Sequence, residues 1–356
     1  MPPPRRDLEL TRAQLQEWLS QRLPDADDLR IPEIAGPSTT GFSSDTLLFD
    51  AHWQAGGAAR CERLVARLKP TGFTVFPRYD IALQYRVLDI LGRTAVSVPQ
   101  VRWLEEDEGV LGVPFYVMNR IDGRVPSDNP PYHVGGWVPE ITPAERAELW
   151  WSGLEAMTHI HRLDWGALGL TFLDQPRGAT TRLAQQLQEY DTFLDWGMKR
   201  HQYPLLDRAL SWLRAHQPVS EPVALCWGDS RLGNQIFAGV RCAGVLDWEM
   251  VRLGDPVQDL AWWIALDRCF TEGLGIERLD GFPDEAATVA RWEELVGRSA
   301  EHYGYYEMLA LFKFAAIMAR VCLQMKHHEI FPADSDMDVN NLASVTLARV
   351  LDEVGA

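Results

Sequence analysis

The spacing of apolar and polar residues changes along the chain, and strand patterns are concentrated in its first third. After a Pro-rich arm, residues 1–30 carry leucines at helical spacing (Leu8, Leu10, Leu15 and Leu19), which predicts an amphipathic helix. A loop rich in Gly, Ser and Thr follows at residues 36–44. Further along, short apolar runs predict strands at 46–49, 63–68 and 111–121, and a helical spacing covers 78–92.

Beyond about residue 140 the pattern becomes mainly helical. The compact segment 221–263 interrupts it, and a long apolar helix, predicted to be core, lies around 305–326. The change in pattern predicts an α+β fold with a small sheet lobe, a hinge near residues 118–123 and a larger helical lobe. We place the two domains at residues 1–118 and 119–356.

Composition narrows the class of protein. The 356 residues are 46% hydrophobic and 24% charged, which is typical of a globular protein. The net charge of -16 disfavours nucleic acid and membrane surfaces as partners; it suits a cationic small molecule, although plain solubility explains it more simply. The five Cys are scattered, which argues against a disulfide framework or a structural zinc site. Without a signal core or an apolar stretch of membrane-spanning length, we expect a cytoplasmic protein.

The segment 225–249 holds the residues with the clearest chemistry. Two short apolar strands each end in a carboxylate, Asp229 and Asp247, and Asn234 lies five residues after the first. If these strands pair as a hairpin, the three side chains converge at one end. Asn234 and Asp247 then offer hard oxygen ligands to Mg²⁺, and Asp229 can accept the proton of an attacking hydroxyl. This set suits phosphoryl transfer from a metal nucleotide.

The stretch 226–263 resembles the catalytic region of the aminoglycoside phosphotransferase and choline kinase family. In particular it resembles a subgroup related to the kinase-like domain attached to some acyl-CoA dehydrogenases. That family has H-G-D-x-x-x-x-N, then D-W-E, G-D-P and D-L-A. This chain supplies the matching residues in the same order: Gly228-Asp229, Asn234, Asp247-Trp248-Glu249, Gly254-Asp255-Pro256 and Asp259-Leu260-Ala261.

The resemblance implies a protein-kinase-like fold with two lobes, an antiparallel-sheet N-lobe and a mainly helical C-lobe. It also implies ATP and Mg²⁺ as cofactors. Asp229 would be the catalytic residue, Asn234 and Asp247 would hold the metal, and Glu249 would contact metal-bound water. Asp255 and Asp259 are expected to be structural, anchoring the catalytic loop from the start of a helix.

The resemblance extends upstream and implies a nucleotide site. Residues 111–123 are similar to the family's strand into the interlobe hinge, so backbone groups of Met118, Asn119 and Arg120 would meet the adenine. Arg67 and Lys69 share one strand face, and either could bind phosphate; we favour Arg67. Three residues of the Gly/Ser/Thr loop would cover the phosphates: Ser38, Thr39 and Thr40.

Two positions depart from the family pattern. Trp227 stands where the family has His, and Trp can donate only one hydrogen bond. Gln84 stands where the family has the Glu that pairs with the phosphate-binding cation; Asp80, four residues earlier, is a candidate replacement. These departures support the alternative of a non-catalytic nucleotide-binding module.

The sequence therefore predicts an ATP- and Mg²⁺-dependent phosphotransferase acting on a hydroxyl of a small molecule, either aminoglycoside-like or hydroxyacyl. It predicts neither which acceptor nor the oligomeric state. Three other sites have little support. His159 and His161 face apart on a helix, Ser230 lacks a G-x-S-x-G elbow, and no P-loop motif occurs.

Overall fold

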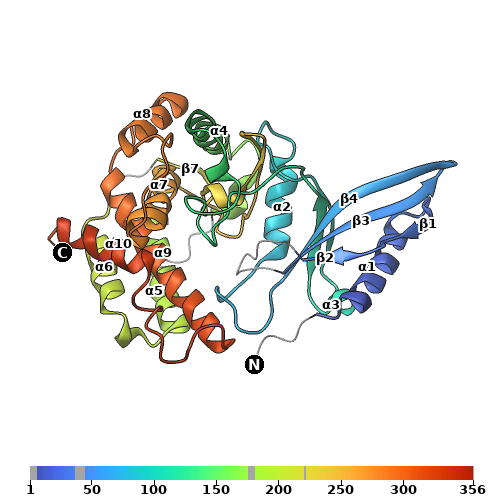
Figure 1. Ribbon diagram of the computed structural model, residues 1–356, viewed down its shortest axis with the longest axis horizontal. Coiled ribbons are helices and arrows are strands. Elements are labelled where there is room, and N and C mark those ends of the chain that lie inside the picture. Colours follow the sequence, from blue (N-terminus) through green and yellow to red (C-terminus); the bar gives the residue numbers. More distant parts are fainter. Residues whose placement is uncertain (1–5, 37–44, 175–180, 220–221, 356) are drawn as a thin grey trace. The chain divides into compact units, whose positions relative to one another are not determined.

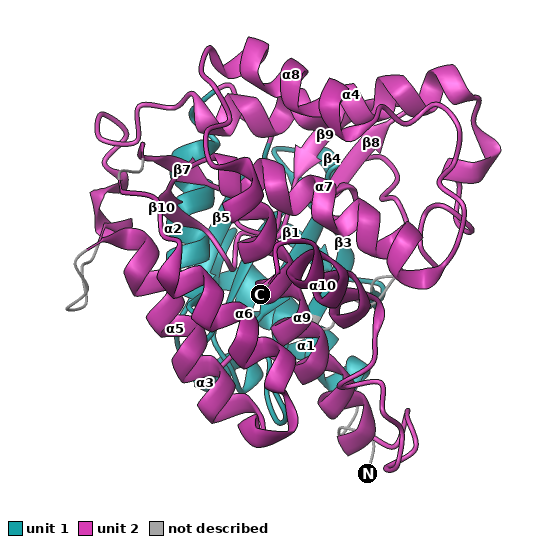
Figure 2. Cartoon of the chain, turned by 90° about the vertical axis from the view of Figure 1, so that its left-hand side faces the viewer, with its two compact units in different colours: residues 1–74, 78–94, 98–121 teal, residues 75–77, 95–97, 122–356 magenta. Residues whose placement is uncertain are grey.

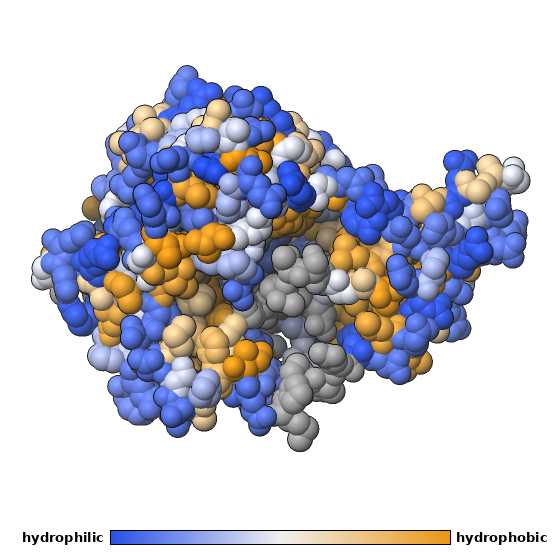
Figure 3. Space-filling model, viewed as in Figure 1, coloured by the Kyte–Doolittle hydropathy of each residue, from blue (hydrophilic) through white to orange (hydrophobic). Residues whose placement is uncertain are grey.

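The chain forms two compact units in a computed structural model that describes residues 6–36, 45–174, 181–219 and 222–355 (Figure 2). Unit 1 comprises residues 1–74, 78–94 and 98–121, and unit 2 comprises residues 75–77, 95–97 and 122–356. The face drawn in Figure 3 is mostly hydrophilic with separate apolar patches, as the net charge of -16 leads one to expect.

Unit 1 is an antiparallel sheet with helices (Figure 1). Its strands run in the order β1-β3-β4-β6-β5, and β2 pairs with β3. The strands are β1 (Asp27–Arg30), β2 (Ile34–Ala35), β3 (Asp45–Ala55), β4 (Ala58–Leu68), β5 (Val101–Glu105) and β6 (Phe115–Asn119). The helices are α1 (Leu8–Arg22), α2 (Ile81–Leu91) and α3 (Glu108–Leu111).

Strands β3 and β4 are longer than their apolar runs predict. They form a hairpin closed by Gly56 and Gly57, whose φ values of 58° and 76° match the left-handed positions of a tight primed turn. The part of β4 before Leu64 is mainly exposed, and the part from Leu64 to Leu68 is mainly buried. Hydrophobicity therefore revealed only the buried half of the strand, while the Gly-Gly pair marked the turn.

The amphipathic helix predicted near the N-terminus is α1, and it covers the core of unit 1. Asp7 caps it by accepting a hydrogen bond from Leu10 N. Its buried residues Leu15, Trp18 and Leu19 join the core formed by the sheet. The Trp18 ring lies 4.9 Å from that of Phe115, and its indole N–H donates to Glu105 at 2.8 Å.

Unit 2 is mainly helical and carries two small antiparallel sheets, β7–β10 and β8–β9 (Figure 1). Its α-helices are α4 (Pro143–His161), α5 (Arg182–Gly197), α6 (Pro204–Ala215), α7 (Val257–Thr271), α8 (Glu285–Val296), α9 (Tyr303–His327) and α10 (Leu342–Glu353). Its strands are β7 (Ala224–Cys226), β8 (Gln235–Ala238), β9 (Arg241–Val245) and β10 (Arg252–Gly254). Five 3₁₀ turns in the described chain cover 138–140, 170–173, 200–202, 232–234 and 272–274.

Helix α9 is the predicted apolar helix near the C-terminus. By length and composition it could cross a membrane, so the expectation that no segment reaches that length is wrong. However, 72% of its most apolar window is buried inside the structure, as in the core helix of a soluble protein. It packs against α7, which carries the end of the motif region. We therefore treat α9 as a core helix of unit 2.

Candidate active site

The strands around the predicted catalytic residues pair differently from the expectation. Strand β7, which precedes Asp229, pairs with β10, and β9, which precedes Asp247, pairs with β8. The two carboxylate-bearing strands therefore do not pair with each other, so the hairpin considered from the sequence does not form. A short apolar run predicts a strand but not the strand with which it pairs, because several other apolar runs in the chain have a similar length.

Loop contacts bring the predicted residues together instead. The Asn234 side-chain nitrogen donates to Asp229 twice, to Oδ2 at 2.6 Å and to the backbone oxygen at 3.0 Å. The backbone N–H of Leu246 donates to the backbone oxygen of Asn234 at 2.8 Å, which ties the residue before Asp247 to the same loop. Asp247 has a φ of 59°, a left-handed conformation that is uncommon outside glycine and concentrates at functional sites.

The Asp229 carboxylate receives two further donors. Arg231 Nε lies 3.1 Å from both carboxylate oxygens, and the indole N–H of Trp262 donates to Oδ1 at 2.9 Å. Arg231 also pairs with Asp128. Burial opposes the charge of Arg231, but the carboxylates of Asp128 and Asp229 outweigh it and raise its pKa. These contacts fix the direction of a carboxylate whose side chain is 14% exposed.

Gly228 allows the chain to approach the neighbouring loop closely. Its φ is 97°, and an added Cβ would lie 2.2 Å from the backbone oxygen of Met250. No residue with a side chain fits there without moving the backbone. The glycine before Asp229 is therefore required by the geometry of the turn.

Asp259, near the start of α7, holds this turn. Its carboxylate accepts hydrogen bonds from the backbone N–H groups of Trp227 at 2.6 Å and Gly228 at 2.9 Å. His161 Nε2 lies 3.0 Å from Asp259 Oδ2, and His161 Nδ1 accepts from Trp292 at 3.1 Å, so Nε2 carries the proton given to Asp259. The predicted anchoring role of Asp259 is confirmed, and His161 is its support rather than a metal ligand.

Asp255 has a different structural role. Its carboxylate accepts from Val257 N at 3.0 Å at the start of α7. Burial raises the pKa of Asp255. This agrees with the expectation that Asp255 is structural.

Trp227 uses its single donor at the loop that carries Asp247. The indole N–H lies 2.7 Å from the Leu246 oxygen and 3.2 Å from the Asp247 oxygen, and the ring is fully buried beside Trp248. The side chain therefore links the turn before Asp229 to the loop at Asp247. Packing and one hydrogen bond hold this part of the site.

Replacing Trp227 by His, the residue usual in the family, is expected to destabilise the protein. A smaller polar ring leaves a cavity in a fully buried site, and we expect a loss of about 2–3 kcal/mol in the free energy of unfolding. Denaturant unfolding measures it, with Trp227→Phe as the control that keeps most of the ring. Equal stability of Trp227→His and wild type would contradict the packing role.

The family follows from comparison with known proteins. The model of the phosphotransferase enzyme family (APH) matches residues 41–295, more than half of the chain and including the whole loop described above. The chain belongs to this family. The motifs of segment 226–263 thus lie in the region that the family model covers, and the resemblance noted from the sequence is confirmed.

Individual relatives are similar in part. Acyl-CoA dehydrogenase family member 10 of Mus musculus is 30% identical over 73% of this chain but only 24% of its own length. Family member 11 of Rattus norvegicus is 26% identical over 85% of this chain and 38% of its own length. The chain therefore spans about a quarter to two fifths of the curated relatives that it matches.

Solved structures show the fold. A Ralstonia eutropha protein assigned to the aminoglycoside phosphotransferases has a TM-score of 0.68 at 24% identity, covering 96% of this chain and 98% of that one. A variant of aminoglycoside phosphotransferase APH(4)-Ia, in complex with AMP-PNP and hygromycin B, has a TM-score of 0.58 at 14% identity, covering 96% of this chain and 100% of the other. The predicted α+β, protein-kinase-like fold is confirmed, with the antiparallel sheet in unit 1 and the helices mainly in unit 2.

The metal-ligand prediction fits the donor chemistry of this phosphotransferase loop. Because the Asn234 nitrogen is bound to Asp229, its side-chain oxygen is the atom left to face a cation. Asp247 adds a carboxylate, and half-buried Glu249 lies in the same loop. Within residues 6–36, 45–174, 181–219 and 222–355, no group of three or more His, Cys, Asp or Glu could hold a metal. Mg²⁺ takes few protein ligands and completes its shell with water and phosphate, so the oxygen donors of this one loop are compatible with it.

The predicted nucleotide residues of unit 1 lie on β4 and β6. Arg67 faces Tyr116 and Thr46 in the register of the sheet, and Lys69 follows the end of β4. The loop residues predicted to cover the phosphates lie outside the described residues: Ser38, Thr39 and Thr40.

The backbone groups predicted to meet adenine are partly in use. Met118 and Asn119 end β6, and Arg120 follows. Asn119 N donates to the Gln100 oxygen and Arg120 N donates to the Arg63 oxygen, each at 2.8 Å. Because the N–H groups of Asn119 and Arg120 are already bonded, these two residues would bind a nucleotide through their backbone carbonyls.

Gln84 and Asp80 have clear positions in unit 1. Gln84 is 2% exposed on α2. Asp80 caps that helix, because its carboxylate accepts from Leu83 N at 2.8 Å. The suggestion that Asp80 replaces the family's Glu as partner of the cation is thus less favoured than a capping role.

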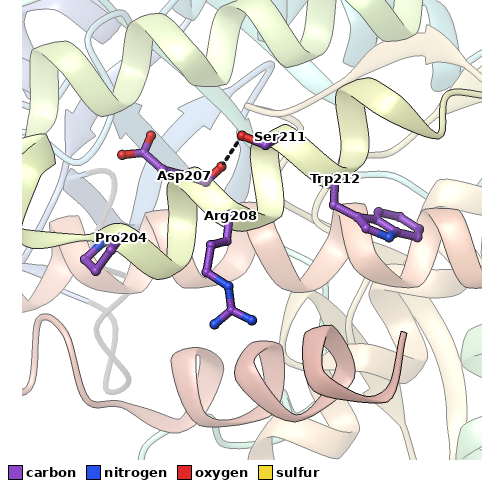
Figure 4. Close-up of a pocket in the computed structure, with 5 residues that line it drawn as sticks. All are labelled: Pro204, Asp207, Arg208, Ser211 and Trp212. Carbon is purple, nitrogen blue, oxygen red and sulfur yellow. Dashed lines mark hydrogen bonds between the residues drawn. The ribbon is translucent and has the colours of Figure 1, made fainter. Parts of the chain in front are cut away.

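A depression of the surface lies on α6, outside the segment that carries the motifs (Figure 4). It is open to solvent and lined by five residues of one helix: Pro204, Asp207, Arg208, Ser211 and Trp212. Asp207 already accepts from Arg200 at 2.7 Å, and Ser211 donates to the backbone oxygen of Asp207 at 2.8 Å. This group offers no set of ligands for a metal nucleotide, so the loop around Asp229 remains the candidate active site.

Proposed function

We propose that this protein transfers the γ-phosphate of ATP, in the presence of Mg²⁺, to a hydroxyl group of a small molecule. The observation that carries the proposal is the bond between Asn234 and Asp229, which sets a proposed metal ligand directly beside a proposed catalytic carboxylate. Phosphoryl transfer needs those two functions at neighbouring points, one for the phosphates and one for the attacking oxygen.

Asp229 would orient the acceptor hydroxyl and accept its proton. Trp262, Arg231 and Asn234 all donate to its carboxylate, so the group is held in one direction before the acceptor arrives. Such preorganisation lowers the barrier because little rearrangement is needed at the moment of transfer. The chain contributes position and charge rather than a covalent intermediate.

Asn234 and Asp247 would hold Mg²⁺, with Glu249 contacting metal-bound water. The metal, when bound, neutralises charge on the phosphates. The backbone N–H of Leu246, the residue before Asp247, donates to the backbone oxygen of Asn234, so the loop itself limits how far apart the two proposed ligands lie. The Trp227 indole bond to the same loop further restricts it.

Two acceptor classes are proposed. Solved structures of similar fold include a phosphotransferase in complex with hygromycin B, which favours an aminoglycoside-like acceptor. The curated relatives are named acyl-CoA dehydrogenase family members, which favours a hydroxyacyl compound. The net charge of -16 is compatible with a cationic acceptor but does not select one.

The test is Mg²⁺-dependent release of ADP from ATP, measured with each acceptor class in parallel. Hygromycin B and other aminoglycosides form one series, and hydroxyacyl compounds form the other. Stimulation by one series above the acceptor-free rate supports the proposal and selects the class. ATP binding without stimulated release in either series would instead favour the non-catalytic nucleotide-binding module.

Arg67→Ala is expected to raise KM for ATP about 10-fold or more, with a smaller effect on KM for the acceptor. The reason is the loss of a charged hydrogen bond to phosphate. Lys69→Ala, two residues further along, is the matched comparison, and we expect less than about a 3-fold change from it. A larger effect from Lys69→Ala than from Arg67→Ala would transfer the phosphate role to Lys69.

The non-catalytic alternative rests on Trp227 and Gln84. In unit 2 the Trp227 indole bonds the loop at Asp247, so this departure from the family replaces a support without removing a metal ligand or Asp229. Gln84 lies on α2 and leaves the proposed ligands of unit 2 unchanged. We therefore rank catalysis ahead of binding alone.

A further inference from the structure

Trp262 donates to Asp229 from outside the family motifs, on a helix distant in sequence from the Asp229 loop. It lies on α7, three residues after Asp259, and is 2% exposed. Its indole N–H donates to Asp229 Oδ1 at 2.9 Å, while Asn234 donates to Oδ2. Two rigid donors therefore hold opposite oxygens of the carboxylate.

Lys313 lies over the face of the Trp262 ring. It is on α9 and is 2% exposed, and its Nζ lies 4.8 Å from the centroid of the Trp262 ring and 6.0 Å from that of Tyr190. Within the described residues it makes no ion pair with a carboxylate at contact distance. Other charged or titratable groups that act on it are Arg252, Asp259, Cys226 and Asp229.

Burying the charged amine of Lys313 costs desolvation free energy, so its presence in the core needs a physical explanation. Burial, followed by the charge of Arg252, lowers its pKa to about 8. An apolar side chain of similar length would avoid this desolvation. A cation near the face of an indole is attracted by the ring, and it draws electron density from the ring and strengthens the N–H as a donor.

The neighbouring Trp263 offers an internal comparison. It follows Trp262 on the same helix and is also 2% exposed, yet its indole N–H has no hydrogen-bond acceptor in the described part of the chain. These adjacent tryptophans of equal burial thus differ in their indole hydrogen bonds, because only that of Trp262 reaches Asp229. Packing alone explains why Trp263 is buried, but it does not explain why the indole N–H of Trp262 points at the Asp229 carboxylate.

We propose that Trp262 and Lys313 are positioning residues for Asp229: the indole N–H fixes one carboxylate oxygen, and the buried ammonium holds and polarises the indole. The proposal rests on the phosphotransferase function given above and deepens it. Neither residue needs to touch the acceptor. Both act through Asp229, and their removal should lower kcat more than it changes KM for ATP.

The hydrogen bond itself is tested without turnover. Indole ¹⁵N–¹H spectra are recorded for wild type and Asp229→Ala, with Trp262→Phe and Trp263→Phe used to assign the two signals. We expect the Trp262 signal to shift in Asp229→Ala and the Trp263 signal to stay near its wild-type position. An unchanged Trp262 signal would overturn the proposed contact.

The kinetic test compares Trp262→Phe with Trp263→Phe in ADP release from ATP. Deleting an N–H bonded to a charged group is expected to lower kcat about 10- to 100-fold, with KM for ATP within about 3-fold of wild type. Trp263→Phe should keep kcat within about 3-fold. Equal kcat for the two variants would overturn the inference while leaving the proposed function intact; no turnover by wild type with either acceptor series would remove both.

Lys313 is tested by Lys313→Met and Lys313→Arg. Lys313→Met should lower kcat about 3- to 10-fold, the size of a desolvated cation–π contact, and should raise Tm by a few degrees because a buried charge is removed. Lys313→Arg keeps the charge and should recover part of the lost kcat. A higher Tm with unchanged kcat in Lys313→Met would show that Lys313 has no positioning role.

Discussion

Asp229→Asn is expected to lower kcat roughly 100- to 10,000-fold while leaving KM for ATP nearly unchanged. An amide cannot take the proton of the acceptor hydroxyl, and the loss of a positioned base has this magnitude. The amide also places an N–H₂ group among donors from Trp262, Arg231 and Asn234, so its orientation is less defined than that of the carboxylate. Steady-state release of ADP with the selected acceptor measures the loss.

Asp247→Asn serves as the control for this prediction, because it alters a proposed metal ligand instead of the base. It should raise the Mg²⁺ concentration needed for half-maximal activity, whereas Asp229→Asn should leave that concentration close to the wild-type value. Unfolding curves for both variants exclude a folding defect. If Asp229→Asn retained more than about a tenth of the wild-type kcat, the assignment of the catalytic carboxylate would be wrong.

Asp259→Ala is expected to reduce the free energy of unfolding by about 3–5 kcal/mol, since it leaves three buried donors without their acceptor. These donors are the backbone N–H groups of Trp227 and Gly228 and the ring of His161. Asp259 is 1% exposed, so water cannot replace the carboxylate without opening the turn. Urea denaturation followed by Trp fluorescence measures the change.

Asp352→Ala is a suitable control for the loss of stability. Asp352 is an aspartate of the same unit that pairs with Arg208 at 3.4 Å and whose side chain is 74% exposed. Removing it should change the free energy of unfolding by less than about 0.5 kcal/mol. Similar losses in Asp259→Ala and Asp352→Ala would mean that the contacts to the catalytic turn contribute little.

The sequence was sufficient to find the loop and the class of fold. The segment 226–263 carries ordered motifs whose spacing is fixed by local geometry, and Asn234 lies against Asp229 within a single turn of chain. Helical spacing likewise located α1, α2 and α9, because each has an apolar face or an apolar run long enough to be distinctive. Local patterns and short-range contacts are what one sequence expresses most directly.

The remaining site residues depend on contacts between distant segments. Arg231 meets Asp128, 103 residues earlier, and His161 meets Asp259, 98 residues later. The spacing of apolar residues cannot predict such pairs, because these contacts arise only when the helices and loops pack together. One signal was present: Lys313 is a cation flanked by apolar residues on both sides within α9, and a charge in that position often has a functional reason.

The strand partners were also beyond the reach of local patterns. Hydrophobicity located the runs that end at Asp229 and Asp247, but β7 pairs with β10 and β9 pairs with β8. The partner of a three-residue strand is chosen by the turns and helices around it. The contacts between the candidate site residues therefore came from the structure, while the residues themselves were proposed from the sequence.

Transfer of label from γ-³²P-ATP to an acceptor is the most direct test of the central claim. Wild type is incubated with Mg²⁺, labelled ATP and either an aminoglycoside or a hydroxyacyl compound, beside Asp229→Asn. The account predicts label in the acceptor from wild type, none without Mg²⁺, and a loss of at least about 100-fold in the variant. Labelled ATP that binds the protein yet passes no label to any acceptor in either series would contradict it.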